Sequence, residues 1–234
     1  MYRGHATSLG LSVVLDLERG LDLNDLRERV SDYAIVTDYD DSLNVLQRRT
    51  GTAIDFMRAA HRTALLAWLR QWGCRHLDLA SEATSAAALR TWARQWVPEL
   101  PDPARPLTKL NNDDITILAI AYAKLSSMVA GARRRATGDV AVTFGPTAAA
   151  KAVYALRPNA CAPWDDPIRH ALGMGGNDAA YRAYLHLVAR ALTNTADRAG
   201  ITVARLPGKV GRPESSPPKL IDEYLWMRIT RGAA

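Results

Sequence analysis

The chain has little cysteine and no long apolar segment. Cysteine occurs at two of the 234 positions, Cys74 and Cys161, without C-x-x-C spacing, which excludes a disulfide-rich scaffold. The apolar run ITILAIAYA, at 115–123, is shorter than the ~18 residues that a membrane-spanning helix needs. Asp16 and Glu18 occupy the region in which a signal peptide would have its cleavage site. We therefore expect a cytoplasmic protein without a membrane span.

Several signature motifs are also missing. The sequence has no G-x-G-x-x-G loop, no Walker loop and no G-x-S-x-G turn, which argues against dinucleotide binding, nucleotide hydrolysis and elbow-type hydrolases. Its five histidines form neither H-x-x-x-H nor H-E-x-x-H, and a zinc site at Cys74 and His76 would need distant partners. We expect no metal site and no cofactor.

Apolar residues recur at helical spacing in almost every long segment, which predicts an all-α fold. In 52–72 the stripe contains Leu65 and Trp68, and the segment ends at Gly73. Another apolar helix is expected from about 112 through Val129. The run PELPDPARP contains four prolines and no helical pattern, so it is the candidate boundary between two regions, 1–106 and 107–234, within a single compact unit.

The charge of the chain leans basic, with 30 Lys and Arg against 24 Asp and Glu. A basic face is typical of proteins that bind polyanions such as DNA. The arginine triplet also suits the end of the helix expected before it, where cations are stabilised by the helix dipole, so a solvated helix end is the alternative to phosphate contact. Two clusters are candidates for DNA binding: Arg133, Arg134 and Arg135, and, in a loop rich in proline and glycine, Arg205, Lys209 and Arg212.

The most informative stretch is VTFGPTAAAKAVYALRPNACAPWDDPIRHA, at 142–171. It contains a glycine turn, an apolar helix, a proline-bounded connector and an acidic helix start. This order resembles the helix-hairpin-helix DNA glycosylase superfamily, in which a turn of the L-P-G-V-G-x-K/R-T-A kind precedes a helix, a connector and an aspartate that opens the next helix. Gly145 and Thr147 correspond to the end of that turn, and Asp165, 18 residues after Thr147, corresponds to the aspartate. The resemblance implies a two-lobed helical fold.

The resemblance also implies a DNA repair enzyme that hydrolyses the N-glycosidic bond of a damaged or modified base in duplex DNA. Gly145 and Thr147 would bring backbone N–H groups to a phosphate, and a flipped nucleotide would enter the pocket. Asp165 would stabilise positive charge at the sugar C1′ and orient a water. Strand-cleaving members use a lysine just before the turn threonine, where this chain has Pro146. Lys151 lies one turn later on the same helix face, so we expect it at the site, with base release but no strand cleavage.

Two neighbours of Asp165 are candidates for substrate binding, and both have a structural alternative. Trp164 could stack on a flipped base or fill the core. Asp166 could contact the substrate or cap a helix that begins at Pro167, with Asp165 adding favourable charge. A second hypothesis is a non-enzymatic helical module that binds nucleic acid or a protein partner on the same scaffold. The two hypotheses differ in whether Asp165 is reachable from solvent in a cleft or is a plain cap.

Overall fold

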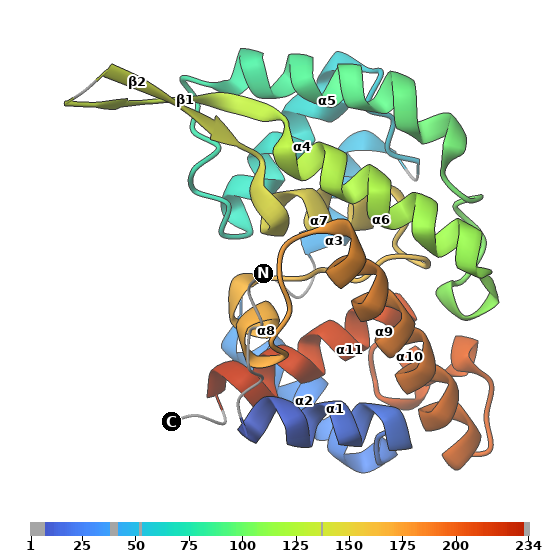
Figure 1. Ribbon diagram of the computed structural model, residues 1–234. Coiled ribbons are helices and arrows are strands. Elements are labelled where there is room, and N and C mark those ends of the chain that lie inside the picture. Colours follow the sequence, from blue (N-terminus) through green and yellow to red (C-terminus); the bar gives the residue numbers. More distant parts are fainter. Residues whose placement is uncertain (1–7, 38–41, 52, 137, 232–234) are drawn as a thin grey trace.

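The computed structural model describes residues 8–37, 42–51, 53–136 and 138–231 and is mostly helical, as the periodicity predicts (Figure 1). One antiparallel hairpin, β1 paired with β2, interrupts the helices. The last helix continues into a π-helical turn, η4. The bounds of the elements are α1 Ser8–Arg19, α2 Leu23–Val36, α3 Ser42–Thr50, α4 Ala59–Gln71, α5 Glu82–Trp96, η1 Val97–Glu99, η2 Leu107–Lys109, α6 Asn112–Ser127, β1 Val129–Arg135, β2 Gly138–Thr143, α7 Gly145–Leu156, α8 Asp166–Ala171, α9 Asp178–Arg198, η3 Val203–Arg205, α10 Leu206–Lys209, α11 Pro217–Trp226 and η4 Met227–Arg231.

The hairpin corrects the all-α prediction. The helix expected to run through Val129 ends at Ser127, and the chain continues as a strand. Val129 and Gly131 are poor helix formers. A Cβ at Gly131 would lie 2.2 Å from the Ser81 hydroxyl, so the approach of β1 to the start of α5 favours glycine. The arginine triplet therefore belongs to a strand and not to a helix end.

The helices form two lobes that do not follow the division at residue 106. Helix α1 packs on α9 and α2 packs on α11, so the two ends of the described chain share one lobe. The other lobe consists of α4, α5, α6, α7 and the hairpin, and α6 also packs on α9 (Figure 1). The Leu21 amide illustrates the long-range closure, because it donates to Thr195 Oγ1 at 2.9 Å. Elements of 1–106 thus pack directly on elements of 107–234.

Aromatic side chains fill the centre of the fold. Trp68, which belongs to the apolar stripe predicted in 52–72, is buried in the core, and so are Trp72 and Trp92. Trp164 is fully buried and lies parallel to Tyr184, with ring centroids 5.2 Å apart. Such packing is worth about 0.5–1.5 kcal/mol per pair beyond burial, so these rings hold the connector before α8 in place.

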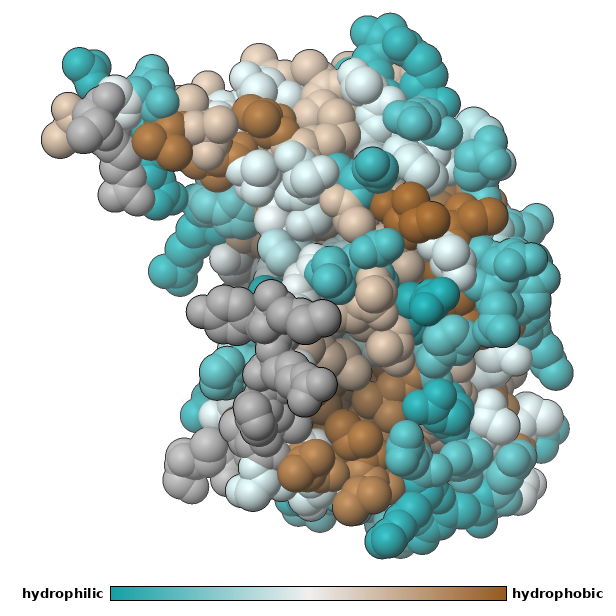
Figure 2. All heavy atoms as spheres, in the orientation of Figure 1, coloured by the Kyte–Doolittle hydropathy of each residue, from teal (hydrophilic) through white to brown (hydrophobic). Residues whose placement is uncertain are grey.

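Hydrophobic side chains also reach the surface. On the face drawn in Figure 2 they gather over α1, which exposes Leu11 and Leu15, and along the hairpin, which exposes Val129 and Val140. None of the helices in the described part of the chain has the length and apolar character needed to cross a membrane.

Candidate active site

A pocket of about 370 Å³ lies where α7, α8 and α11 meet the loop that follows α4. It brings together Lys151 and Asp165, the two catalytic candidates predicted from the sequence, and we call it the Lys151–Asp165 pocket. Its volume falls in the ~300–1,000 Å³ range of small-molecule sites. Other lining residues that matter for its chemistry are Tyr33, Trp72, His76, Thr147, Asp166, Asp222 and Trp226.

Asp165 is both the cap of α8 and a wall of this pocket. Its Oδ1 accepts a hydrogen bond from the Ile168 backbone N–H at 3.3 Å, so Asp165, and not Asp166, is the capping residue. A carboxylate has about four acceptor positions, and the cap uses one of them. Burial raises the pKa of Asp165, and the charge of Asp222 raises it further. The side chain is only partly buried, so the cap and the pocket roles coexist.

Lys151 points from α7 into the same pocket. Its Nζ donates to the Trp72 carbonyl oxygen at 2.5 Å and lies 4.6 Å from the centroid of the Trp72 ring. The residue is 8% exposed, and burial lowers the pKa of its ammonium group. A buried amine of this kind is closer to the neutral, nucleophilic form than a surface lysine.

Arg169 connects the two segments that the sequence analysis associated. Its guanidinium donates to Thr147 Oγ1 at 3.2 Å, to the Trp164 carbonyl oxygen at 3.0 Å and to Asp166 Oδ1 at 2.7 Å. Thr147 belongs to the first turn of α7 and Asp166 to the first turn of α8. The arginine therefore fixes the turn residues relative to Asp165.

Gly145 begins α7 with a φ of 70°, a left-handed conformation that favours glycine. No side-chain hydrogen bond caps this end of α7. The element before Gly145 is the strand β2, so the turn joins a strand to a helix.

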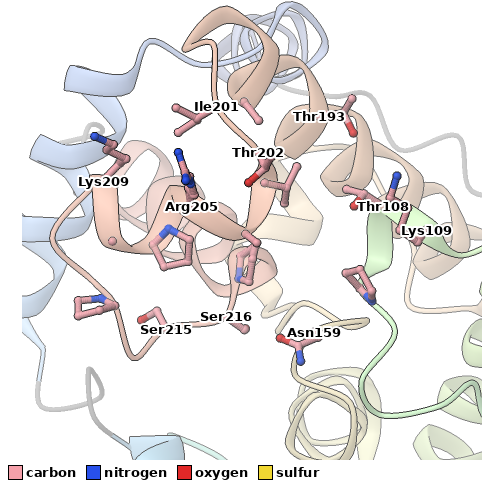
Figure 3. Close-up of a pocket in the computed structure, with 18 of the residues that line it drawn as sticks. Thr108, Lys109, Asn159, Thr193, Ile201, Thr202, Arg205, Lys209, Ser215 and Ser216 are labelled. Carbon is pink, nitrogen blue, oxygen red and sulfur yellow. The ribbon is translucent and has the colours of Figure 1, made fainter.

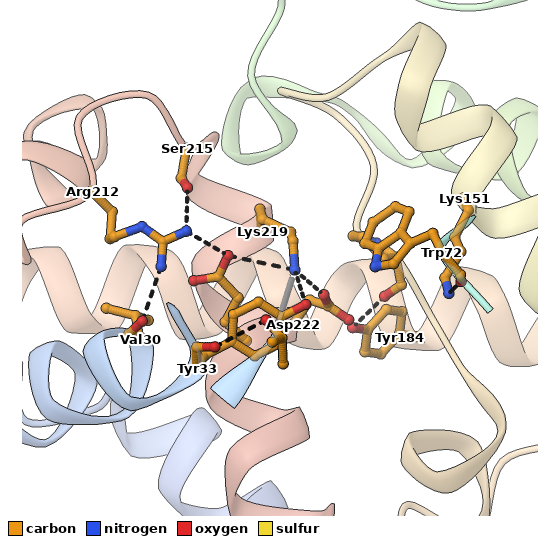
Figure 4. A network of polar contacts seen from close by, with 12 residues as sticks. Val30, Tyr33, Trp72, Lys151, Tyr184, Arg212, Ser215, Lys219 and Asp222 are labelled. Carbon is orange, nitrogen blue, oxygen red and sulfur yellow. Dashed lines mark hydrogen bonds and ion pairs between the residues drawn. The ribbon is translucent and has the colours of Figure 1, made fainter. Parts of the chain in front are cut away.

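A buried ionic network borders the pocket (Figure 4). Lys219 Nζ lies 2.7 Å from Asp222 Oδ2 and 3.5 Å from Glu223 Oε1. Arg212 continues the network, with Nη2 at 3.1 Å from Glu223 Oε1 and Nη1 donating to the Val30 carbonyl oxygen at 2.9 Å. The Arg212 side chain is 11% exposed, so it lies inside the fold, which corrects its expected contact with DNA.

Trp164 and Asp166, the two substrate-binding candidates, lie in different surroundings. Trp164 is fully buried and does not line the pocket. Its side chain fills the core, and the expectation that it stacks on a flipped base is wrong. Asp166 lines the pocket with a side chain that is 86% exposed, where it pairs with Arg169.

The remaining basic candidates lie on separate surfaces. Arg133 and Arg134 are exposed on β1, and the side chain of Arg135 lies outside the described part of the structure. Arg205 and Lys209 line a second groove of about 1230 Å³, next to Lys109 (Figure 3). In Figure 1 the hairpin projects on the side of α8, whereas α10 lies on the other side, so the two clusters belong to different surfaces of the molecule.

The sequence analysis missed several pocket residues. Asp222 and Lys219 have the i, i+3 spacing of an ion pair, but this spacing is common on exposed helices and says nothing about a pocket. Tyr33 and Trp226 reach the pocket through the packing of α2 on α11, a long-range contact without a local signal. Within the described residues no group of three or more His, Cys, Asp or Glu side chains is arranged to hold a metal ion.

Comparisons with protein families, with curated proteins and with solved structures give no significant match for this chain.

Proposed function

We propose that the Lys151–Asp165 pocket is the active site of a DNA glycosylase-like enzyme that hydrolyses the N-glycosidic bond of a damaged or modified base. One observation carries the proposal: Asp165 and Lys151, predicted as a pair from the sequence, line the same pocket. Burial and the charge of Asp222 raise the pKa of this partly buried carboxylate, which makes it a better proton acceptor than an exposed aspartate.

The chemistry follows from a flipped nucleotide whose sugar lies beside Asp165. As the bond between C1′ and the base nitrogen lengthens, positive charge develops on the sugar, and a carboxylate next to it stabilises that charge. Asp165 then accepts a proton from the water that attacks C1′. Aromatic side chains of Tyr33, Trp72 and Trp226 provide apolar walls for such a base.

The surroundings of the pocket suit DNA. The uncapped first turn of α7 offers N–H groups for a phosphate, and Arg169 holds this turn near Asp165. The hairpin with Arg133 and Arg134 projects from the same side of the molecule as α8 (Figure 1). A duplex lying across this side would meet the exposed cations of the hairpin as well as the pocket.

The direct test uses oligonucleotides that each carry one modified base, followed by alkaline cleavage of the abasic product. Asp165→Asn should abolish base release while DNA affinity stays unchanged or rises, because a negative charge near phosphate is removed. Asp113→Asn, at an exposed site in the first turn of α6, is the matched control and should keep full activity. Full activity in Asp165→Asn would overturn the assignment.

Lys151 is expected at the site without acting as the strand-cleaving nucleophile, since its Nζ is held against the Trp72 carbonyl oxygen. Base release should therefore require the alkaline step for strand breakage. Borohydride trapping of a covalent adduct between Lys151 and abasic DNA would contradict this expectation.

The second groove favours one other candidate, a non-enzymatic module that binds a polyanion such as nucleic acid. Arg205, Lys209 and Lys109 place three cations around it, against the single carboxylate of Asp197 (Figure 3). In that case binding would depend on Arg205 and Lys209 and would be indifferent to Asp165. No modified base would be released from any oligonucleotide of the panel.

A further inference from the structure

Asp222 is a second carboxylate of the Lys151–Asp165 pocket. It comes from α11, 57 residues after Asp165, and is 6% exposed. Its Oδ2 lies 2.7 Å from Nζ of Lys219, which is itself 3% exposed (Figure 4). The same ammonium group lies 3.4 Å from the Tyr33 hydroxyl and 4.4 Å from the centroid of the Tyr33 ring. The lysine is therefore held on several sides and in turn holds the Asp222 carboxylate.

Burying these charges is costly unless they are paired. The ion pair between Lys219 and Asp222 offsets part of that cost. A costly arrangement of this kind next to a pocket indicates a functional role.

Asp165 feels charged and titratable groups from several elements. Among the charged groups, Asp222 on α11 has the largest effect on the pKa of Asp165, and like burial it raises this pKa. Lys151 on α7 and Arg169 on α8 act in the opposite direction. The other titratable groups that face Asp165 or Asp222 are Tyr33, Cys74, His76, Tyr154, Asp166, Tyr184, Lys219 and Glu223.

We propose that Asp222, held by Lys219, is a positioning residue that places a fixed negative charge beside Asp165 in this pocket. The role rests on the proposed function. The water oxygen forms the new bond to C1′, the electron pair of the broken C1′–N bond leaves with the base, and the water proton moves to Asp165. Asp165 then passes this proton to the departing nitrogen, so both carboxylates end the cycle unchanged. A negative neighbour makes Asp165 a stronger proton acceptor in the first transfer.

The primary test reads the protonation of Asp165 without any substrate. Aspartate carboxyl carbons are labelled with ¹³C, the Asp165 and Asp222 signals are assigned from the Asp165→Asn and Asp222→Asn variants, and both are followed by NMR during acidification. In the wild type Asp165 should titrate above the ordinary value of about 3.9. In Asp222→Asn its midpoint should fall, whereas Glu82→Gln, which breaks the pair with Arg70 in the other lobe, should leave it unchanged.

Two outcomes would overturn the proposal. One is an Asp165 midpoint that is the same in Asp222→Asn and in the wild type. The other outcome is that the Asp222 carboxylate takes up its proton before Asp165 on acidification, since no fixed charge would then be present when Asp165 is protonated. This measurement needs no stable variant at Asp222, because the signals can be assigned from Asp165→Asn and sequential connectivities.

The activity arm separates this role from a structural one. If base release is found, Asp222→Asn should lower its single-turnover rate about three- to tenfold and move the acidic limb of the pH profile to lower pH. A lower rate with an unmoved limb would mean that Asp222 only supports the fold. If no base is released from any substrate, the proposed function fails, while the NMR result still decides whether Asp222 controls Asp165.

Discussion

Arg169 Nη1 donates a hydrogen bond to Thr147 Oγ1 at 3.2 Å and thereby joins α8 to the first turn of α7. The same nitrogen donates to the Trp164 carbonyl oxygen at 3.0 Å, and the guanidinium carbon lies 5.6 Å from the centroid of the Trp164 ring. One buried cation thus fixes the distance between the turn that we propose for phosphate and the carboxylate that we propose for catalysis.

Replacing Arg169 by Met should therefore lower the free energy of unfolding by about 1–3 kcal/mol. The loss arises because the buried Trp164 carbonyl group and the Thr147 hydroxyl lose their partner. Urea unfolding monitored by circular dichroism measures it. Arg190→Met is the matched control, since Arg190 and Glu18 are 54% and 47% exposed and such pairs contribute less than about 1 kcal/mol. Equal losses in both variants would show that Arg169 does not connect the two helices.

Asp165→Asn should make the protein more stable at neutral pH. Burial and the charge of Asp222 raise the pKa of Asp165 in the folded chain, so the unfolded chain releases its proton first as the pH rises. As the pH rises, the wild type loses stability between the pKa of Asp165 in the unfolded chain, about 3.9, and its raised pKa in the folded chain. Above the second pKa the loss of stability stays constant. Asparagine still caps α8 and avoids this penalty. Thermal unfolding should give equal midpoints at about pH 3 and a higher midpoint for the variant at about pH 7.

Asp114 provides the control of opposite sign. The backbone N–H of Asn111 and the guanidinium of Arg105 hold the pKa of Asp114 below its ordinary value. The stability that ionised Asp114 contributes is present above its pKa in the unfolded chain. It is lost as the pH falls through the lower pKa that Asp114 has in the folded chain. Asp114→Asn should thus be less stable than the wild type at neutral pH, with a gap that closes on acidification. A gap of the same sign in both variants would contradict the assigned shifts.

The sequence predicted the parts of the site that depend on local signals. Asp165 was predicted because it follows Thr147 by 18 residues, as the aspartate does in the glycosylase pattern that 142–171 resembles, and Lys151 because it follows Thr147 at i+4 spacing. The mainly helical fold followed from the apolar periodicity in the same way. Both catalytic candidates do line one pocket.

The missing parts depend on contacts between distant segments. Asp222 reaches the pocket only because α2 packs on α11, and no local pattern encodes that packing. Trp164 looked available because prolines flank it, but Tyr181 and Tyr184 stack against it and bury it. The hairpin was not predicted because three consecutive arginines in β1 break the alternation of apolar and polar residues that marks a strand, and the close approach of Gly131 to Ser81 is a long-range contact without a local signal.

Gly20→Ala should destabilise the fold strongly. Gly20 has a φ of 82°, and a Cβ there would lie 2.5 Å from the backbone carbonyl carbon of Asn194 on α9. Backbone strain and the clash together should cost about 2–4 kcal/mol.

Gly51→Ala is the control, because Gly51 has a φ of 81° but nothing within 4 Å of its Cβ position. Its cost should be about 1 kcal/mol, from strain alone. Denaturant unfolding that ranks the two variants equally would argue against the contact between α1 and α9.

The two basic surfaces can be told apart by the salt dependence of DNA binding. Each phosphate contact contributes about −0.9 to the slope of log affinity against log salt. If duplex DNA lies across the hairpin side, replacing Arg133 and Arg134 together by Ala should make the slope shallower by up to about 2. Both side chains are exposed on β1, so helix content should not change.

Replacing Arg205 and Lys209 by Ala should leave the slope as in the wild type, because these residues line the groove on the other side of the molecule. The reverse pattern would favour the second groove as the binding surface and remove the support that the hairpin gives to the glycosylase proposal. Binding weaker than about 10⁻⁴ M at low salt, below ordinary non-specific affinity, would remove both surfaces from consideration.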